Sequence, residues 1–509
     1  MAESQAETIA FLADPANHHG AVPERIDTHI SAVFLAGDRA FKLKKAVWLP
    51  FLDFTTLAAR KAACEAELAI NRRATPDLYL GVRAVTRRPD GTLALDGDGD
   101  GEAVDWVVEM RRFDQGTLFD RLARRGEMDR ALVNQLTEVV FAFHAQAPHR
   151  PDKGGVKGLA WTIDTNRASM LPHVPAMLEA EAVERLAERS HAALARLGPL
   201  LEARREAGLV RHCHGDLHLG NICLYQGRPA LFDAIEFSED IACIDVFYDL
   251  AFLLMDLDRR GNRQAASWVM NHYLDLSGDF QGVGALPLFL SARAGIRAHV
   301  AAAMAVHADG ERAGQLAGEA RDYLAAALAY LEPPPPRLLA VGGLSGSGKS
   351  RMGRELAPFL GVPGAAVVRT DSLRKHLMGV SIHDRLGPEG YAAEVTERTY
   401  QALYGTCARL LAAGHSVVAD AVFARPGQRA AIEDIARRAG VRFDGLWLEV
   451  PSELAAARIV ERKANVSDAT PEVLERQRSY DLGAIAWTRI DSSPPKDATL
   501  AAGRSVLGI

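Results

Sequence analysis

A glycine-rich loop places the strongest constraint on the fold of this chain. Residues 343–350 read Gly-Leu-Ser-Gly-Ser-Gly-Lys-Ser, after an apolar run at 338–341 and before a stretch with helical periodicity. Glycines permit a tight turn between a strand and a helix, and they let backbone N–H groups point at a phosphate. The pattern predicts a strand, a phosphate-binding loop and a helix, and hence an α/β sheet in this part of the chain.

The loop also predicts which residues contact a nucleotide. Lys349 would reach the β- and γ-phosphates, and the Ser350 hydroxyl would hold magnesium. Backbone N–H groups, helped by the start of the helix, would bind the β-phosphate. The residues expected to contact the nucleotide are Gly343, Ser345, Gly346, Ser347, Gly348, Lys349 and Ser350.

Strands and helices are predicted to alternate after this loop. Apolar runs at 366–370, 416–419 and 442–449 are separated by helical stretches, a pattern typical of a mostly parallel sheet covered on both faces. Asp420 directly follows the second of these runs. An aspartate at the end of such a strand is a candidate magnesium ligand, so we expect Asp420 to serve the same site as Ser350.

Further polar residues follow these strands. Asp371 and Arg374 come directly after the run that ends at residue 370. Asp371 could also cap the next helix, since it precedes Ser-Leu-Arg, and both roles are compatible. Arg458 and Arg462 are four residues apart and share one helix face, where they would either stabilise transition-state charge or face solvent.

A second motif lies far upstream. Residues 214–221 read His-Gly-Asp-Leu-His-Leu-Gly-Asn, the spacing in which kinases place a catalytic base and a metal ligand. Asp216 is the candidate base, and Asn221, five residues later, is a candidate magnesium ligand. Asp233 follows the next apolar strand and is the candidate second ligand.

The region before this motif is predicted to supply a lysine that binds phosphate. The sequence Arg-Ala-Phe-Lys, which ends at Lys42, fits the strand that carries this lysine in kinases. Lys44, on the same strand face, is the alternative. The partner of this lysine would be an acidic residue of the helix predicted at 56–73, for which we favour Glu67 over Glu65.

A run of four prolines at 333–336 predicts a domain boundary, because prolines cannot continue a helix and favour an extended spacer. The predicted fold class is an α+β bilobal protein-kinase-like fold followed by an α/β P-loop NTPase domain with a mostly parallel sheet. The expected parts are a domain at 1–330, with a small lobe at 1–110 and a helical lobe at 111–330, a linker at 331–337 and a domain at 338–509.

Charge and cysteine content argue against several other functions. The part after Pro336 carries 23 Lys+Arg against 19 Asp+Glu, a net of +4, within a chain of net charge −6. A nucleic-acid-binding domain would have a stronger basic surface, so nucleic acid is not an expected partner. Five cysteines without paired spacing, no signal-peptide pattern and no apolar run of membrane-spanning length favour a cytoplasmic protein without a membrane partner.

Residues 1–330 resemble the aminoglycoside phosphotransferase family, a branch of the protein-kinase-like fold. The resemblance rests on His214-Gly-Asp-Leu-His218 together with Asn221 and Asp233. It implies transfer of the ATP γ-phosphate to hydroxyls of small molecules. It further implies that Asp216 is the catalytic base and that Asn221 and Asp233 bind magnesium.

The chain departs from the pattern of this family in two places. No Gly-x-Gly-x-x-Gly loop is present in the small lobe, where Thr-His-Ile-Ser occupies residues 28–31. The segment after the candidate metal aspartate, residues 235–240, is unusually acidic. Small-molecule kinases commonly lack the glycine loop, so the first departure is compatible with the resemblance.

Residues 337–509 resemble the predicted kinases near gluconate kinase, chloramphenicol phosphotransferase, zeta toxin and the kinase part of polynucleotide kinase phosphatase, a group of AAA-type P-loop proteins. The phosphate-binding loop carries most of this resemblance. It implies that Asp371 is the base and that Arg374 helps to bind the reactants. It also implies that Arg458 or Arg462 is a lid arginine.

The two regions together predict a bifunctional phosphotransferase that depends on ATP and magnesium and acts on small-molecule hydroxyls. One alternative is regulatory: the kinase-like part would bind a metabolite and gate a P-loop ATPase. Another alternative is that the C-terminal domain phosphorylates nucleotides, polynucleotide 5′-hydroxyls or nucleotide sugars.

Overall fold

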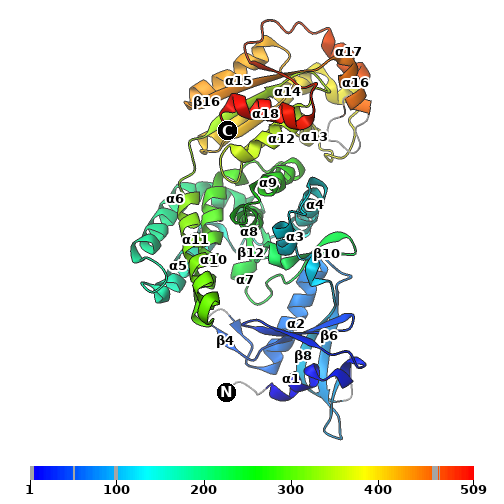
Figure 1. Ribbon diagram of the computed structural model, residues 1–509, viewed down its shortest axis with the longest axis vertical. Helices are drawn as coiled ribbons and strands as arrows, with labels where there is room; N and C mark the ends of the chain where they lie inside the picture. Colours follow the sequence, from blue (N-terminus) through cyan, green and yellow to red (C-terminus); the bar gives the residue numbers. More distant parts are fainter. Residues whose placement is uncertain (1–4, 50–51, 97–100, 461–467, 469) are drawn as a thin grey trace. The chain divides into compact units, whose positions relative to one another are not determined.

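The computed structural model describes residues 5–49, 52–96, 101–460, 468 and 470–509. The chain forms two compact units, one of residues 1–161 with 198–256 and the other of residues 162–197 with 257–509 (Figure 1). The predicted two-domain fold class is confirmed, because the first unit holds the small lobe and the loop of Asp216, and the second holds the P-loop and its parallel sheet. The division between the units does not follow the expected linker at 331–337, since helices that precede the prolines pack with the P-loop sheet.

The first unit begins with an antiparallel sheet of six strands among the described residues, in the order β1-β2-β3-β8-β6-β7. A two-residue turn joins β2 to β3, with Ala36 opposite Arg39 and Gly37 at φ +57°. Inward-facing residues such as Phe34 and Val107 are fully buried. The strands are β1 (Glu24–Asp27), β2 (Ser31–Ala36), β3 (Arg39–Lys44), β6 (Tyr79–Arg87), β7 (Leu93–Asp96) and β8 (Glu102–Arg111), with a separate pair β4 (Trp48–Leu49) and β5 (Leu52–Asp53).

Helix α2 (Leu57–Arg72) packs against β6 and β8 of this sheet. The helix begins after Thr56, whose Oγ1 accepts a hydrogen bond from the backbone N–H of Ala59 at 3.2 Å and so satisfies a donor of the first turn. Its buried face carries Cys64 and Glu67. Glu67 is thereby directed into the lobe, toward the lysines of β3.

The loop that carries the predicted catalytic base lies between short strands in the same unit. β9 (Val210–His212) pairs with β12 (Cys243–Asp245), and β10 (Ile222–Tyr225) pairs with β11 (Arg228–Leu231). The loop follows β9 and leads into β10, and Asp233 follows β11, as the sequence predicted. Helices that lie wholly or partly in this unit are α1 (Ala6–Ala13), α3 (Phe119–Arg125), α4 (Arg130–Gln146), α5 (Gly155–Met170), α6 (Ala180–Glu206), α7 (Glu239–Ala242) and α8 (Val246–Arg259).

Among the described residues, a parallel sheet of five strands forms the centre of the P-loop part of the second unit. The strand order is β14-β15-β13-β16-β17, so the strand that leads into the P-loop is central. The predicted parallel sheet is confirmed, but its fifth strand was not predicted, because the sequence Thr-Arg-Ile-Asp contains only one apolar residue. The strands are β13 (Arg337–Gly342), β14 (Ala366–Arg369), β15 (Val417–Asp420), β16 (Arg442–Glu449) and β17 (Thr488–Asp491).

Helices cover both faces of this sheet. α12 and α18 close an apolar core that contains Val341, Val418 and Leu446, while α14 and α15 pack against the opposite face. Among the described residues, no helix is both long enough and apolar enough to cross a bilayer. The helices are α9 (Arg263–Ser277), α10 (Leu286–Val306), α11 (Gly310–Tyr330), α12 (Lys349–Leu356), α13 (Thr370–Leu377), α14 (Ala393–Ala412), α15 (Pro426–Ala439), α16 (Ser452–Val460), α17 (Pro471–Arg478) and α18 (Lys496–Leu507).

Strand β14 is an edge of the parallel sheet, and helix α9 lies along it. Asn271 of α9 accepts a hydrogen bond from the backbone N–H of Val367 at 2.7 Å and donates one to the carbonyl oxygen of Ala365 at 3.1 Å. One turn earlier, Ser267 contacts Gly364, where an added Cβ would lie only 2.7 Å from the serine hydroxyl. Helix α9 therefore satisfies backbone groups that a sixth strand would otherwise pair.

Candidate active sites

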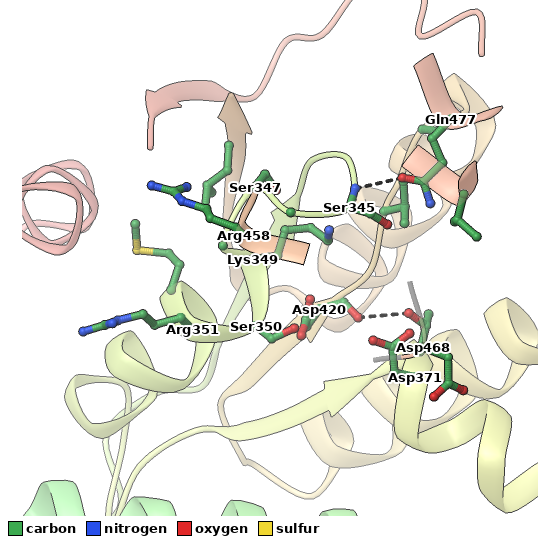
Figure 2. Close-up of a pocket in the computed structure, with 18 of the residues that line it drawn as sticks. Ser345, Ser347, Lys349, Ser350, Arg351, Asp371, Asp420, Arg458, Asp468 and Gln477 are labelled. Carbon is green, nitrogen blue, oxygen red and sulfur yellow. Dashed lines mark hydrogen bonds between the residues drawn. The ribbon is translucent and has the colours of Figure 1, made fainter. Parts of the chain in front are cut away.

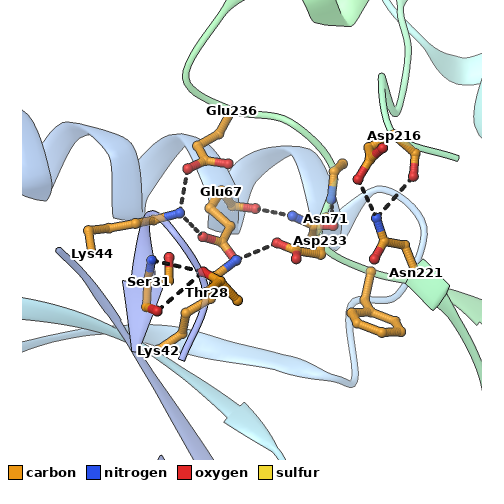
Figure 3. Close-up of polar contacts among 12 residues, drawn as sticks. Thr28, Ser31, Lys42, Lys44, Glu67, Asn71, Asp216, Asn221, Asp233 and Glu236 are labelled. Carbon is orange, nitrogen blue, oxygen red and sulfur yellow. Dashed lines mark hydrogen bonds and ion pairs between the residues drawn. The ribbon is translucent and has the colours of Figure 1, made fainter. Parts of the chain in front are cut away.

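Lysine and glutamate side chains form a buried ion-pair network in the small lobe (Figure 3). Glu67 is completely buried between two lysines: its Oε1 accepts from Lys42 Nζ at 2.8 Å, and its Oε2 contacts Lys44 Nζ. Lys42 also contacts Asp233, whereas Lys44 contacts Glu236. Lys42 is therefore the lysine that faces the predicted metal ligand, while Lys44 is enclosed within the lobe.

This network keeps both lysines protonated. Burial alone would lower the pKa of Lys42, but the carboxylates of Asp233 and Glu67 raise it well above its usual value. Burial alone would also lower the pKa of Lys44, but Glu67 and Glu236 raise it above its usual value. Burial also raises the pKa of Glu236 itself, against the opposing effect of Lys44.

Glu67→Gln is expected to destabilise the first unit by about 3 kcal/mol, because it leaves two buried lysines short of a counter-charge. Glu65→Gln, on an exposed side chain of the same helix, is the matched control and should change stability by less than about 0.5 kcal/mol. Calorimetric unfolding of the full chain measures both. Equal losses of stability in the two variants would show that the buried ion pairs of Glu67 stabilise the fold no more than the exposed side chain of Glu65 does.

The three polar residues predicted to carry out chemistry lie next to this network (Figure 3). Asn221 Nδ2 donates to Asp216 Oδ2 at 2.9 Å and to the Asp216 carbonyl oxygen at 3.0 Å. Asp233 has a backbone φ of +62°, a conformation uncommon outside glycine and concentrated at functional sites. Burial would raise the pKa of Asp233, but Lys42 lowers it below its usual value, so this carboxylate is charged at neutral pH.

Two aspartates of α8 hold the backbone around Asp216. Asp249 accepts hydrogen bonds from the backbone N–H groups of His214 at 3.0 Å and Gly215 at 2.9 Å. Asp256, two turns later on the same helix, accepts a hydrogen bond from the backbone N–H of Leu219 at 3.1 Å. We did not predict Asp256 as a site residue, although its spacing of seven from Asp249 places both on one helix face.

The P-loop adopts the conformation that its glycines predict (Figure 2). Gly343, Gly346 and Gly348 have φ values of +138°, +84° and +93°, and α12 begins immediately after the last of them. Lys349 Nζ donates to a carbonyl oxygen of the loop at 3.0 Å. Within the described residues, the Ser347 hydroxyl is buried and has no hydrogen-bond partner, which suits a group that contacts a bound phosphate.

Gly346→Ala is expected to weaken nucleotide binding at the P-loop at least tenfold, roughly 1.4 kcal/mol. An added Cβ would lie 2.6 Å from the Ala455 carbonyl oxygen, so the loop would have to move. Gly348→Ala is the matched control: its φ is also positive, but the nearest atom to a Cβ is 3.9 Å away. Nucleotide titration compares the affinities of the two variants. Equal losses of affinity would show that backbone strain alone, and not the contact with Ala455, causes the effect.

A pocket of about 800 Å³ opens beside the P-loop. Asp371, in the first turn of α13, and Asp420, at the end of β15, both line it. The N-cap residue of α13 is Arg369, so the structure does not show the capping role considered for Asp371. The candidate base and the candidate metal ligand therefore share the cavity of the P-loop.

Two of the three arginines predicted for this site also line the pocket. Arg374 Nη1 donates to a backbone carbonyl at 2.7 Å, and its guanidinium lies over the ring of Tyr391, 4.8 Å from the centroid. Arg458 Nη2 donates to the carbonyl oxygen of Ser492 at 2.8 Å, so its helix face is not simply solvated. Arg462 lies outside the described residues.

Two pocket residues were not predicted from the sequence. Gln477 of α17 accepts a hydrogen bond from the backbone N–H of Ser345 at 2.8 Å and so supports the P-loop. Asp468 accepts from Lys375 Nζ at 3.1 Å and from the Tyr391 hydroxyl at 3.2 Å. Gln477 belongs to no motif, and Asp468 lies in the segment 465–469, which resembles the lid of small P-loop kinases.

The donor groups at both sites suit magnesium. Asn221 and Asp233 offer amide and carboxylate oxygens, and since the Asn221 NH₂ group donates to Asp216, its oxygen is the atom that can bind a metal. In the P-loop pocket, Ser350 offers a hydroxyl and Asp420 a carboxylate. Magnesium prefers such oxygen ligands, together with phosphate oxygens, so the residues present fit this ion at each site.

The two parts of the chain are both kinase-like in fold. Comparison with family models agrees: residues 53–282 match the phosphotransferase enzyme family, and residues 338–481 match the AAA domain. The chain therefore carries a domain of the phosphotransferase enzyme family followed by an AAA-type P-loop domain.

Similar proteins extend over almost the whole chain. Uncharacterized proteins of Mycobacterium tuberculosis (strain ATCC 25618 / H37Rv) and Mycobacterium bovis are each 28% identical over 487 residues, which is 93% of this chain and 93% of theirs. A solved gluconokinase from Sinorhizobium meliloti 1021 is 20% identical, with 34% of this chain and 92% of that chain covered and a TM-score of 0.26. A choline/ethanolamine kinase family protein from Mesorhizobium loti is 16% identical, with 64% and 98% covered and a TM-score of 0.38.

Proposed function

We propose that the chain is a bifunctional phosphotransferase, in which each of two separate sites transfers the γ-phosphate of ATP to a hydroxyl of a small molecule. The observation that carries this proposal is that each site has its own complete set of groups. The first combines Lys42, Asp216 and Asp233, and the second combines a P-loop with Asp371 and Asp420, which line its pocket. A chain with one active site and one inactive fold would not need both sets.

In the first site, Asp216 would accept the proton of the attacking hydroxyl. Its carboxylate is held by Asn221 at 2.9 Å and remains partly exposed, with 36% of the side chain accessible. Lys42, fixed by Glu67, would bind phosphate oxygens of ATP. Bound magnesium would neutralise charge on the phosphates, and positioning of the reactants supplies most of the remaining catalysis.

In the second site, the P-loop N–H groups and Lys349 would bind the phosphates of ATP, and Asp371 would accept the proton of the acceptor. Arg374 is held in place by its backbone contact and by Tyr391, so it can orient reactants with little loss of entropy. Arg458 lies on the pocket wall and would stabilise charge that develops on the transferred group.

Calorimetry tests this proposal with the full chain, magnesium and a non-hydrolysable ATP analogue. We expect two bound nucleotides per chain, and a stoichiometry of one or none would contradict two nucleotide sites. A screen with γ-labelled ATP against polyols, amino alcohols and nucleosides then identifies the acceptors. Label that is transferred only to water for every acceptor would favour a regulated ATPase instead.

A further inference from the structure

Helix α9 places a buried carboxylate beside the P-loop site. Asp275 is 2% exposed and contacts three side chains from the P-loop part of the same unit. Its Oδ2 accepts from Arg354 Nη2 of α12 at 2.5 Å and from Arg369 Nη1 at 3.1 Å, and its Oδ1 accepts from the hydroxyl of Ser372 on α13. One carboxylate thus joins the helix that follows the P-loop to the helix that carries the candidate base.

Arg369 continues this chain of contacts to the candidate metal ligand. Its Nε donates to Asp420 Oδ2 at 3.3 Å, while its Nη1 donates to Asp275. The side chains of all three residues are at most 5% exposed. Burial alone would raise the pKa of Asp275, but Arg369 and Arg354 lower it to about 2, so the carboxylate is charged at neutral pH.

The position of Arg369 between two carboxylates decides how much charge Asp420 retains. A guanidinium shared with a buried partner neutralises each carboxylate less than one that pairs with a single acid. If Asp275 loses its charge, Arg369 will pair with Asp420 alone, and the oxygens of Asp420 will become poorer ligands for a cation.

We propose that Asp275 is a positioning residue of the P-loop site, which holds Arg369 so that Asp420 keeps its orientation and its charge for a divalent cation. The proposal rests on the proposed nucleotide site at the P-loop. Asp275 lies within residues 53–282, the part that matches the phosphotransferase enzyme family. A positioning residue of the P-loop site therefore comes from the segment that matches the phosphotransferase enzyme family.

The test measures how much Mg²⁺ is needed for half-maximal binding of a non-hydrolysable ATP analogue to the full chain. The P-loop site is identified as the binding event that Lys349→Ala removes. Asp275→Asn preserves the side-chain shape and removes the charge, and we expect it to raise this Mg²⁺ concentration roughly tenfold. Asp275→Asn with Arg369→Gln removes both charges, and we expect it to return the Mg²⁺ requirement to the wild-type value or below.

Asn271→Ala is the matched control, because it loosens the same helix one turn earlier without changing a charge. We expect it to leave the Mg²⁺ requirement within about twofold of wild type, since no ion pair to Asp420 is altered. If Asp275 served stability alone, Asp275→Asn and Asn271→Ala would each give less folded protein. The folded fraction of each would still need the same Mg²⁺ concentration as the wild type.

Four outcomes would overturn the proposal. One is an unchanged Mg²⁺ requirement in folded Asp275→Asn, and another is an equal rise in Asn271→Ala. If Asp275→Asn does not fold, the double variant decides alone, because a raised Mg²⁺ requirement there contradicts the charge argument. If Lys349→Ala removes no binding event, the proposed nucleotide site at the P-loop fails and this proposal fails with it.

Discussion

Lys349→Ala is expected to remove one of two bound nucleotides from the full chain. Lys349 is the cation at the start of α12, directly after the loop whose N–H groups would bind the phosphates. Truncating one partner of a charged contact of this kind costs about 2 to 5 kcal/mol of binding free energy. In calorimetry with an ATP analogue, the stoichiometry should fall from two to one.

The control for Lys349→Ala is Arg442→Ala, which removes one positive charge from an exposed side chain of the same unit. It should leave both nucleotides bound, because its partner Asp444 is outside the pocket. A stoichiometry of two in Lys349→Ala would mean that this lysine does not hold phosphate. A stoichiometry of zero would mean that the two sites do not bind independently.

Asp216→Asn is expected to lower phosphoryl transfer by the first site about 10² to 10⁴-fold, the usual contribution of a general base. The amide keeps an oxygen that can accept from Asn221, so the loop should retain its shape. ATP affinity should change little, since Lys42 and Asp233 remain. Transfer of labelled phosphate, measured in a Lys349→Ala background, reports on the first site alone.

Asp240→Asn is the control for this variant, since Asp240 is exposed and pairs at the surface with Lys153. In the Lys349→Ala background, Asp240→Asn should transfer phosphate at the same rate as Lys349→Ala alone. If Asp216→Asn retains the full rate, the carboxylate is not the base. If it instead loses ATP affinity with an unchanged rate at saturation, Asp216 contributes to binding, and the proton must leave by another route.

Local patterns predicted most of the framework of both sites. The P-loop before Lys349 follows from backbone rules that act over a few residues, so a short sequence is sufficient to find it. The strand β17 was missed because its polar residues give no apolar run. Such a strand forms because the neighbouring strand β16 offers it backbone hydrogen-bond partners. A local sequence pattern cannot predict this pairing.

The choice between Lys42 and Lys44 could not be made from the sequence. Both lie on the same face of β3, and a period of two places them equally well. Only the distant residues separate them: Asp233 lies 191 positions from Lys42, and Glu236 lies 192 positions from Lys44. The acidic segment that looked like a departure from the family pattern supplies Glu236, the counter-charge for the enclosed lysine.

Asp275 shows a further limit of reasoning from motifs. Nothing in the sequence around it indicates a site, and it lies before the proline run that suggested an independent C-terminal domain. Its role emerges only when α9 lies along β14, which places Asp275 against Arg369. Contacts between segments distant in the sequence, and not the motifs themselves, therefore decide which residues surround the P-loop.

The position of α9 along β14 has a consequence for anyone who expresses the C-terminal domain on its own. A fragment that starts at the proline run would lack Asn271, and β14 would present unpaired N–H and C=O groups to solvent. Such a strand is a template for pairing between copies, so the fragment is expected to aggregate. A soluble recombinant piece would have to include the residues from α9 onward.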